Sequence, residues 1–487
     1  MLSKIDLIRC SRFFWALVLV SLPITSFRFF PFLGRETMVR PLAFYPLAIL
    51  VLILVIRLFR RSIQVRISGT LILLGLFLAA AFGATAWGWT FGPIPMHGQD
   101  FIGRSLRAWV TLAGGMVFFI STIFMNQNDG DLRFSIKWLY AGLLLSLVWG
   151  AIQMAAYYTG FPERLELNKI QLSFSIRKLL VKKRAAGFAY EPSWLANQLA
   201  TIYLPWLAAA IFSGYRVFKK RWIEPVLLAA ALLLLLATFS RGGIIMAFAA
   251  LLLVFMFTQT RRLKNWVQWF IHPFQKNTTI NRHVMNFALR AGILLLIAGM
   301  ITGTGLILSS NKYFSQIWKS QKATLTEYAI DIYAGPRLAY ASAGWEIFLD
   351  HPLTGVGLGA SGLYLYDRIP DWAVTTLSEI TRQLTPNAWL YPNPKNLYIR
   401  ILSETGIAGF IFYVVFLLSI LALIIRFIKS DFPIQKYIGI GGLFSWFVLI
   451  FFNMTQDSFI DPNQWFSMGI FLGISAAISI KKHNNGV

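Results

Sequence analysis

The sequence predicts an all-α polytopic membrane protein, and three observations lead to this fold class. Of the 487 residues, 57% are hydrophobic and only 13% are charged, against about 25% charged residues in a typical soluble domain. The apolar runs are continuous for about twenty residues, the length that one helix needs to cross about 30 Å of hydrocarbon. Strands of a membrane barrel would alternate apolar and polar residues over about ten positions, and this pattern is not seen.

Twelve apolar segments are long enough to be predicted as membrane spans. They are Phe13–Leu33, Leu42–Phe59, Ile67–Trp89, Ser105–Met125, Ile136–Thr159, Phe188–Phe212, Ile223–Phe239, Gly242–Phe257, Phe287–Leu308, Ile407–Ile428, Ile434–Asn453 and Trp465–Ile480. We expect residues 1–487 to form a single integral membrane unit. A shorter polar segment, 160–187, follows the fifth span, and one large loop, 309–406, carries short helices between spans nine and ten.

The distribution of lysine and arginine predicts the orientation of the chain. Basic segments follow the even-numbered spans: Arg57 to Arg66, Arg216 to Arg221, Arg261 to Arg290, Arg426 to Lys436, and Lys481 with Lys482. Cytoplasmic loops of membrane proteins are enriched in these residues, so both termini are predicted to be cytoplasmic. This bias also accounts for the net charge of +25, and we expect no nucleic-acid partner.

On this topology the large loop and the turn at Ser240-Arg241-Gly242 lie on the opposite face. Arg241 stands between two strongly apolar runs. A guanidinium at the membrane surface is costly unless it has a partner or faces water. The alternative is an anchor whose stem reaches the interface, but a tight turn with glycines leaves little room for that.

Lys182, Lys183 and Arg184 are the clearest exception to the orientation rule, because they lie on the outer face. An anionic ligand such as a diphosphate would explain them. The alternative is an interfacial amphipathic helix over Leu165–Leu180 that uses lysines as headgroup anchors. Glu191 follows in the opening turn of the next span, where a carboxylate is expensive unless it is paired or protonated. It is therefore a candidate proton acceptor, with an ion pair to Arg184 or Arg241 as the other interpretation.

The large loop holds further candidates. Arg337 opens a segment with one apolar face, Leu338–Leu349, which ends at Asp350-His351-Pro352. Gly355, Gly357 and Gly359 then form a run whose amides could cradle a phosphate, although close packing is the commoner reason for such glycines. Lys395, Asn396 and Tyr398 precede Glu404. No group of His, Asp, Glu or Cys side chains has metal-ligand spacing, so we expect no metal and no other cofactor.

Taken together, these residues resemble the O-antigen ligase and polymerase superfamily. The resemblance runs from about Arg184 to Gly409 and is carried by short motifs in a fixed order. They are Gly187-Phe188 with Glu191-Pro192-Ser193; Ser240-Arg241-Gly242; Arg337 with Trp345; Asp350-His351-Pro352-Leu353 with Gly355-Val356-Gly357; and Asn396-Leu397-Tyr398 with Glu404-Thr405-Gly406-Ile407. Many relatives carry a histidine just before the asparagine, whereas this chain has Lys395, a poor base at neutral pH but a good phosphate ligand.

The resemblance implies a GT-C-like glycosyltransferase of the bacterial inner membrane that acts at the periplasmic face on undecaprenyl-diphosphate-linked oligosaccharides. The Glu191-Pro192-Ser193 motif favours a polymerase that joins repeat units. A ligase that transfers the glycan to lipid A core or protein is the alternative, and a lipid-linked oligosaccharide flippase or a non-catalytic scaffold are further ones. Membrane lipids, a chain-length regulator and a flippase are the expected partners.

The resemblance and the chemistry together assign roles to the candidate residues. Arg184, Arg241, Arg337 and Lys395 are expected to hold the diphosphate, because arginine and lysine must neutralise the leaving group when no metal does so. Asn396 and Tyr398 are expected to bind substrate. Glu191 is the first choice for the base, followed by Glu404 and His351. Attack opposite the leaving group would invert the anomeric centre.

Overall fold

The computed structural model describes residues 4–29, 38–60, 68–178, 183–271, 280–385, 388 and 391–484. In these residues the protein is helical, and isolated bridges take the place of β-strands. The helices are α1 (Lys4–Ser21), α2 (Phe44–Phe59), α3 (Gly69–Trp89), α4 (Phe101–Met125), α5 (Asp129–Thr159), α6 (Arg164–Phe174), α7 (Pro192–Gln198), α8 (Leu204–Ser213), α9 (Ile223–Ala237), α10 (Arg241–Thr258), α11 (Thr260–Ile271), α12 (Ile280–Ser310), α13 (Lys312–Lys319), α14 (Leu325–Asp331), α15 (Gly335–Asp350), α16 (Asp371–Thr376), α17 (Ser378–Leu384), α18 (Leu397–Ile428), α19 (Pro433–Phe452) and α20 (Pro462–Asn484). A π-helical turn, η1 (Leu199–Tyr203), joins α7 to α8, and two short 3-10 helices, η2 (Ser361–Leu363) and η3 (Tyr366–Arg368), follow α15.

Each predicted span falls on one of these helices, the sixth on α7, η1 and α8 together. Within the described residues, eight helical segments are long and apolar enough to cross a membrane, and α2 and α9 are shorter apolar helices. The prediction of an all-helical polytopic membrane protein is therefore confirmed. The total of twelve spans, the GT-C-like class and the orientation stay predictions.

Two predicted spans have the wrong ends. The first was expected to continue to Leu33, but α1 ends at Ser21, because Pro23 lacks a backbone N–H and disfavours helix at the residue before it. The chain beyond it pairs with distant segments, through bridges of Ser26 with Arg40 and of Phe27 with Ser175. The sixth was expected to begin at Phe188, but α7 begins at Pro192, and Glu191 before it is extended. The first position of a helix is the one that proline favours.

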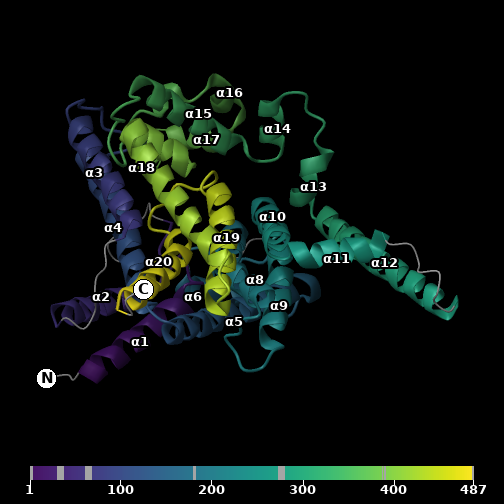
Figure 1. The fold of residues 1–487 in the computed structure, drawn as a ribbon. Coiled ribbons are helices and arrows are strands. Elements are labelled where there is room, and N and C mark those ends of the chain that lie inside the picture. The colour runs from purple at the N-terminus through teal and green to yellow at the C-terminus, as the bar shows by residue number, and fades with distance from the viewer. Residues whose placement is uncertain are drawn as a thin grey trace.

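The bundle is built around α18 and α19. Helix α18 packs on α3 and α19, α19 packs on α8 and α10, and α4 packs on α20. Large side chains such as Trp15, Trp206 and Trp465 are fully buried between these helices. Helices α13 to α17 gather at one end of the bundle, which we call the loop end, while α11 and α12 extend to one side of it (Figure 1).

The loop end has an apolar core of its own. Tyr340, Ala343 and Ile347 on α15 pack with Val356 and Ala360 from the following loop and with Phe101 at the start of α4. This core holds α15 to α17 on the bundle, and it gives the candidate residues of the large loop fixed positions.

Helix α18 is broken at Gly406, where φ is 63° and ψ is −170°. A Cβ at this position would lie 2.2 Å from the backbone oxygen of Leu353. The groups freed by the break are satisfied by the loop that follows α15: Val356 N donates to Ser403 O at 2.9 Å, and Ile407 N donates to Pro352 O at 2.8 Å. An interrupted membrane helix needs such partners, so the break ties the large loop to the bundle.

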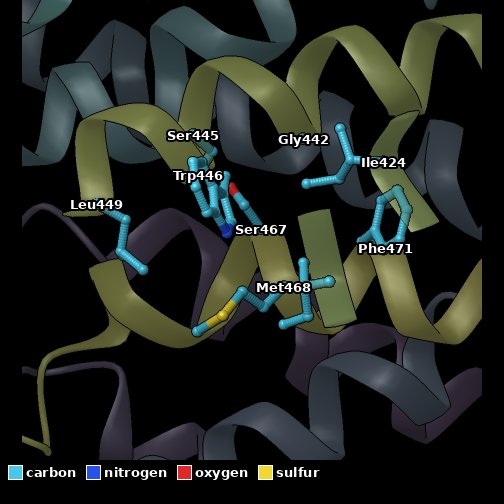
Figure 2. A pocket seen from close by; sticks show the side chains of 9 residues that line it. Ile424, Gly442, Ser445, Trp446, Leu449, Ser467, Met468 and Phe471 are labelled. Carbon is cyan, nitrogen blue, oxygen red and sulfur yellow. The ribbon is translucent and has the colours of Figure 1, made fainter. Parts of the chain in front are cut away.

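A small cavity lies between α18, α19 and α20 (Figure 2). It encloses about 10 Å³, roughly the space of one water molecule. Apolar side chains line most of it, and the hydroxyls of Ser445 and Ser467 both donate to the backbone oxygen of Thr201 in η1. This cavity is too small and too apolar to hold a glycan.

Candidate functional site

Arg241 is the first residue of α10 and lies at the loop end of the bundle. The turn before it places Phe239 at a positive φ of 47°. A Cβ on Gly243 would come within 2.5 Å of Ala196 Cβ, so this glycine lets α10 approach α7 closely. The tight turn predicted from the sequence thus positions the backbone of Arg241 at the start of α10.

The Arg241 guanidinium has few partners of its own. Its Nη1 donates to the backbone oxygen of Ile332 at 2.6 Å, and its carbon lies 4.1 Å from the centre of the Tyr313 ring. Nε and Nη2 are buried and have no hydrogen-bond partner. Such unsatisfied donors cost free energy unless a ligand or water accepts from them.

Arg184 contacts the same aromatic ring. Its guanidinium carbon lies 4.4 Å from the centre of Tyr313, its Nε donates to Thr238 O at 2.8 Å, and the residue is 8% exposed. Burial lowers the pKa of Arg184, with Arg241 and Arg177 also lowering it and Tyr313 and Glu191 raising it. Two arginines from turns far apart in the sequence thus meet on Tyr313, and among the described residues neither has an ion pair with a carboxylate.

Glu191 lies next to this pair but is bound by a different arginine. Its Oε2 accepts from Arg177 Nη1 at 3.1 Å, and its Oε1 accepts from the hydroxyl of Ser193. The expected ion pair with Arg184 or Arg241 is therefore wrong as to partner, since Arg177 in the loop after α6 takes that place. The side chain is 30% exposed, so the carboxylate is still accessible to a substrate.

Of the two lysines before Arg184, the structure describes Lys183. Lys182 lies outside the described residues, and Lys183 Nζ lies 5.3 Å from the centre of the Tyr158 ring. The predicted interfacial helix is present as α6, which ends at Phe174 and not at Leu180. Lys183 therefore contacts a different aromatic ring from the one that Arg184 contacts.

Arg337 lies close along the chain to Tyr333, but it does not join the arginine pair. Tyr333 stacks on Tyr313 with ring centres 5.8 Å apart, and Arg337 follows four residues later in the first turn of α15. Its side chain is exposed. Among the described residues, no hydrogen bond, ion pair or ring contact connects it to Arg184 or Arg241.

Lys395 lies next to Tyr340 on α15. Its Nζ pairs with Glu379 Oε1 at 2.9 Å and lies 4.8 Å from the centre of the Tyr340 ring. Tyr340 is three residues after Arg337, so the two share one face of α15. Lys395 is thus placed within a turn of α15 from Arg337, but it is already paired with a carboxylate.

Asn396 and Tyr398 have structural contacts in place of the expected substrate-binding ones. The Asn396 side chain caps α18 by accepting from Tyr398 N and Ile399 N, and the Tyr398 hydroxyl donates to Ile450 O at 3.0 Å. Both polar groups are therefore occupied by the fold, and a role in substrate binding stays an untested prediction for them.

His351 lies at the opposite end of α15 from Arg337. With a helical rise of 1.5 Å per residue, the fourteen positions between them span about 21 Å. The His351 ring packs on Phe91, with centres 4.8 Å apart, and burial lowers the pKa of its imidazole. This placement separates His351 from Arg337 and from Tyr333 before it.

Glu404 is fully buried in an ion pair. Arg400 Nε donates to its Oε2 at 3.0 Å and the Ser361 hydroxyl donates to its Oε1 at 2.8 Å, and the side chain is 1% exposed. Because the carboxylate is enclosed and not accessible to a substrate, this placement favours a structural role over that of a general base.

The glycine run packs closely and leaves little for a phosphate. Gly355 N donates to His351 O and Gly357 N donates to Glu404 O, each at 2.9 Å. A Cβ at Gly359 would lie 2.5 Å from Ala108 Cβ. Of the two interpretations of this run, close packing is the one that the structure supports.

The fold defines a multi-pass helical membrane protein with a cap of short helices at one end. Residues 226–414 match the family model described as O-Antigen ligase. This match supports the resemblance to the O-antigen ligase and polymerase superfamily that the motifs predict. The family implies a glycosyl-transfer enzyme of polysaccharide synthesis with a lipid-linked glycan as substrate. No curated protein matches the sequence.

The matched region contains Arg241, Arg337, Lys395 and Glu404, whereas Arg184 and Glu191 precede it. Sequence reasoning missed Tyr313, Arg177 and Tyr333, which complete the arginine site. Tyr313 follows the ninth predicted span closely, and an aromatic residue at the end of a span is usually explained as an interfacial anchor. For that reason the sequence offered no specific signal for its contact with two arginines.

Proposed function

We propose that the protein is a polymerase that joins polyprenyl-diphosphate-linked oligosaccharide repeat units at the loop end of the bundle. The observation that carries this proposal is the meeting of Arg184 and Arg241 on the ring of Tyr313. The polyprenyl carrier is undecaprenol, the loop end is the periplasmic face of a bacterial inner membrane, and both termini are cytoplasmic. A chain-length regulator and a flippase are the expected protein partners.

Paired phosphates are the ligand that this site fits best. Two guanidiniums close together repel each other, and a ring face offsets only part of that repulsion. A diphosphate would satisfy the unpartnered Nε and Nη2 of Arg241 and neutralise both charges. Arginine suits this task because its planar donors match two phosphate oxygens at once.

The same contacts would assist departure of the diphosphate. The acceptor hydroxyl forms a new bond to the anomeric carbon while the carbon–oxygen bond to the diphosphate breaks and its electron pair moves to the phosphate oxygen. Donors that stabilise such developing charge contribute about 2.7–4 kcal/mol each. The arginines supply the positive charge of the leaving-group site, so no metal is needed in this scheme.

Glu191 is the proposed proton acceptor. It is accessible, and its carboxylate acts electrostatically on Arg184, whereas Glu404 is enclosed and His351 is remote. The proton of the acceptor hydroxyl passes to Glu191, and attack opposite the diphosphate inverts the anomeric centre. Ser193 and Arg177, which bind the two oxygens, would orient the carboxylate.

A ligase is the second candidate, and the description of the matched family favours it. The chemistry at the donor is the same, because a ligase also displaces a polyprenyl diphosphate. The difference lies in the acceptor, which is a second lipid-linked unit for a polymerase and a lipid A core or protein for a ligase. The Glu191-Pro192-Ser193 motif is the feature of this chain that favours the polymerase.

Reconstitution tests both candidates. The purified protein in liposomes receives a lipid-linked repeat unit and EDTA, with or without a lipid A core. Polymer without the core supports the polymerase, and product only with the core supports the ligase. Arg241→Gln should lower turnover about a hundredfold or more, while Arg382→Gln, an exposed residue on α17, should leave it unchanged. Full activity of Arg241→Gln would refute the proposed site.

A further inference from the structure

A second guanidinium–tyrosine contact lies at the loop end, on a different helix. Arg104 is in the first turn of α4, and its guanidinium carbon lies 3.6 Å from the centre of the Tyr391 ring. Tyr391 is 6% exposed, and Arg104 Nε is buried without a hydrogen-bond partner. The contact has the same composition as that of Arg184 and Arg241 with Tyr313.

The charges around Arg104 do not neutralise it. They are the guanidiniums of Arg107 and Arg400 and the carboxylate of Glu404. Both oxygens of Glu404 are occupied by Arg400 and Ser361. Among the described residues, no carboxylate forms an ion pair with Arg104. A positive charge is therefore held here with a buried donor that faces no acceptor, and this arrangement favours an anionic ligand.

The two guanidinium–tyrosine contacts belong to different parts of the bundle. Helix α4 packs on α20 and contacts α3, whereas α10, which carries Arg241, packs on α19 and α7. Figure 1 shows α4 beside α3 and α10 on the side of the bundle nearer to α12. Arg104 directly precedes the predicted span Ser105–Met125 and lies in the first turn of α4, a depth at which a side chain can meet the phosphates of a lipid-borne molecule.

We propose that Arg104 and Tyr391, with Arg107 beside them, form a second anion site that binds the diphosphate of the acceptor. The inference rests on the proposed function, because only a polymerase uses two substrates that both carry a lipid diphosphate. The donor's diphosphate leaves at Arg184 and Arg241, while the acceptor's diphosphate stays intact at Arg104. No bond is made or broken at this second site; it orients the acceptor sugar.

Counting bound diphosphates tests the inference directly. Farnesyl diphosphate, a soluble prenyl diphosphate, is titrated into the purified full-length protein by calorimetry. The wild-type protein should bind two equivalents, Arg104→Gln one and Arg241→Gln one, while Arg382→Gln should still bind two. Two equivalents in Arg104→Gln, or a single equivalent in the wild-type protein, would overturn the second site. A folded Arg104→Gln variant should still bind one equivalent at Arg184 and Arg241. No binding at all by this variant would therefore also count against two separate sites.

The same variants separate this inference from the proposed function. If Arg241→Gln still binds two equivalents of farnesyl diphosphate, the proposed donor site is wrong, regardless of the result for Arg104→Gln. If Arg241→Gln binds one equivalent and Arg104→Gln still binds two, the donor site is supported and the second site is wrong. In liposomes of phosphatidylcholine, Arg104→Gln should raise the single-unit concentration for half-maximal chain growth about tenfold with little change in kcat. The same concentration for Arg104→Lys should lie between the values for the wild-type protein and Arg104→Gln, since lysine keeps the charge and loses the planar stacking on Tyr391. An effect seen only when phosphatidylglycerol is present would assign the site to an ordinary phospholipid headgroup and overturn the proposal.

Discussion

Replacing Glu404 by glutamine is expected to destabilise the fold, because the side chain is half of a buried ion pair. Arg400 Nε lies 3.0 Å from Glu404 Oε2. Arg400 Nη1 also donates to Asp457 O at 2.6 Å, so the pair joins α18 to the segment before α20. In the Glu404→Gln variant the Arg400 guanidinium stays enclosed without its carboxylate.

The expected loss of stability can be estimated from the geometry. Removing one partner of a buried ion pair typically costs about 3–5 kcal/mol, whereas replacing both partners by apolar residues of similar size is often close to neutral. Ser361 also loses its charged acceptor, and a hydrogen bond to a charged group contributes about 1.5–3 kcal/mol. The double variant Arg400→Met/Glu404→Met should therefore be more stable than Glu404→Gln alone.

Thermal unfolding in detergent, followed by the loss of monodisperse protein on heating, measures both variants. Glu404→Gln should unfold at a clearly lower temperature, and the double variant should recover much of the difference. If Glu404→Gln unfolds like the wild-type protein yet makes no polymer, Glu404 is a catalytic group and our placement of the base at Glu191 is wrong.

Four further predictions concern single positions. Tyr313→Leu should raise the donor KM about thirtyfold while Tyr313→Phe keeps it, because two cation–π contacts of about 1 kcal/mol each depend on the ring and not on the hydroxyl. Burial raises the pKa of Asp461 to about 6, so the stability that this group contributes is lost as pH rises from about 4 to about 6. The melting temperature of Asp461→Asn should lack this fall between about pH 4 and about pH 6. Gly406→Ala should destabilise by several kcal/mol, since φ is positive and its Cβ would clash, whereas Gly75→Ala on α3, with open space around it, should melt normally. Arg337→Gln should weaken donor binding in calorimetry without lowering the melting temperature.

The sequence was sufficient for the helical class and for most helix positions. Continuous apolar runs define where a membrane helix lies, since hydrocarbon allows few other backbone structures. The sequence also singled out Arg241, because a guanidinium between two apolar runs is costly without a purpose, and its role stays a prediction. Helix ends were less well predicted, as at α1, where a proline and long-range pairing decide the boundary.

Contacts between distant segments could not be predicted in the same way. Tyr313 and Tyr391 lie in the large loop, and nothing in their sequence neighbourhood indicates that each ring faces an arginine. The partner of Glu191 was missed for the same reason, since several arginines lie at comparable distances along the chain. The ion pair of Glu404 with Arg400, one helical turn away, was likewise not predicted, and a role for Glu404 as a base stays untested.

Arg337 illustrates how a ligand could complete the site. Its Cα–Cβ bond points toward the start of α15, where Tyr333 stacks on Tyr313. In the free protein a third guanidinium would be repelled there, by about 4 kcal/mol for a like charge at 4 Å under near-surface screening. With a diphosphate bound, the net electrostatic interaction of Arg337 with the site becomes attractive. Each charge-assisted hydrogen bond then contributes about 1.5–3 kcal/mol, which is comparable to or larger than the roughly 2 kcal/mol of rotamer entropy that an exposed arginine loses. The exposed position of Arg337 in this structure is therefore what electrostatics favours before the donor binds.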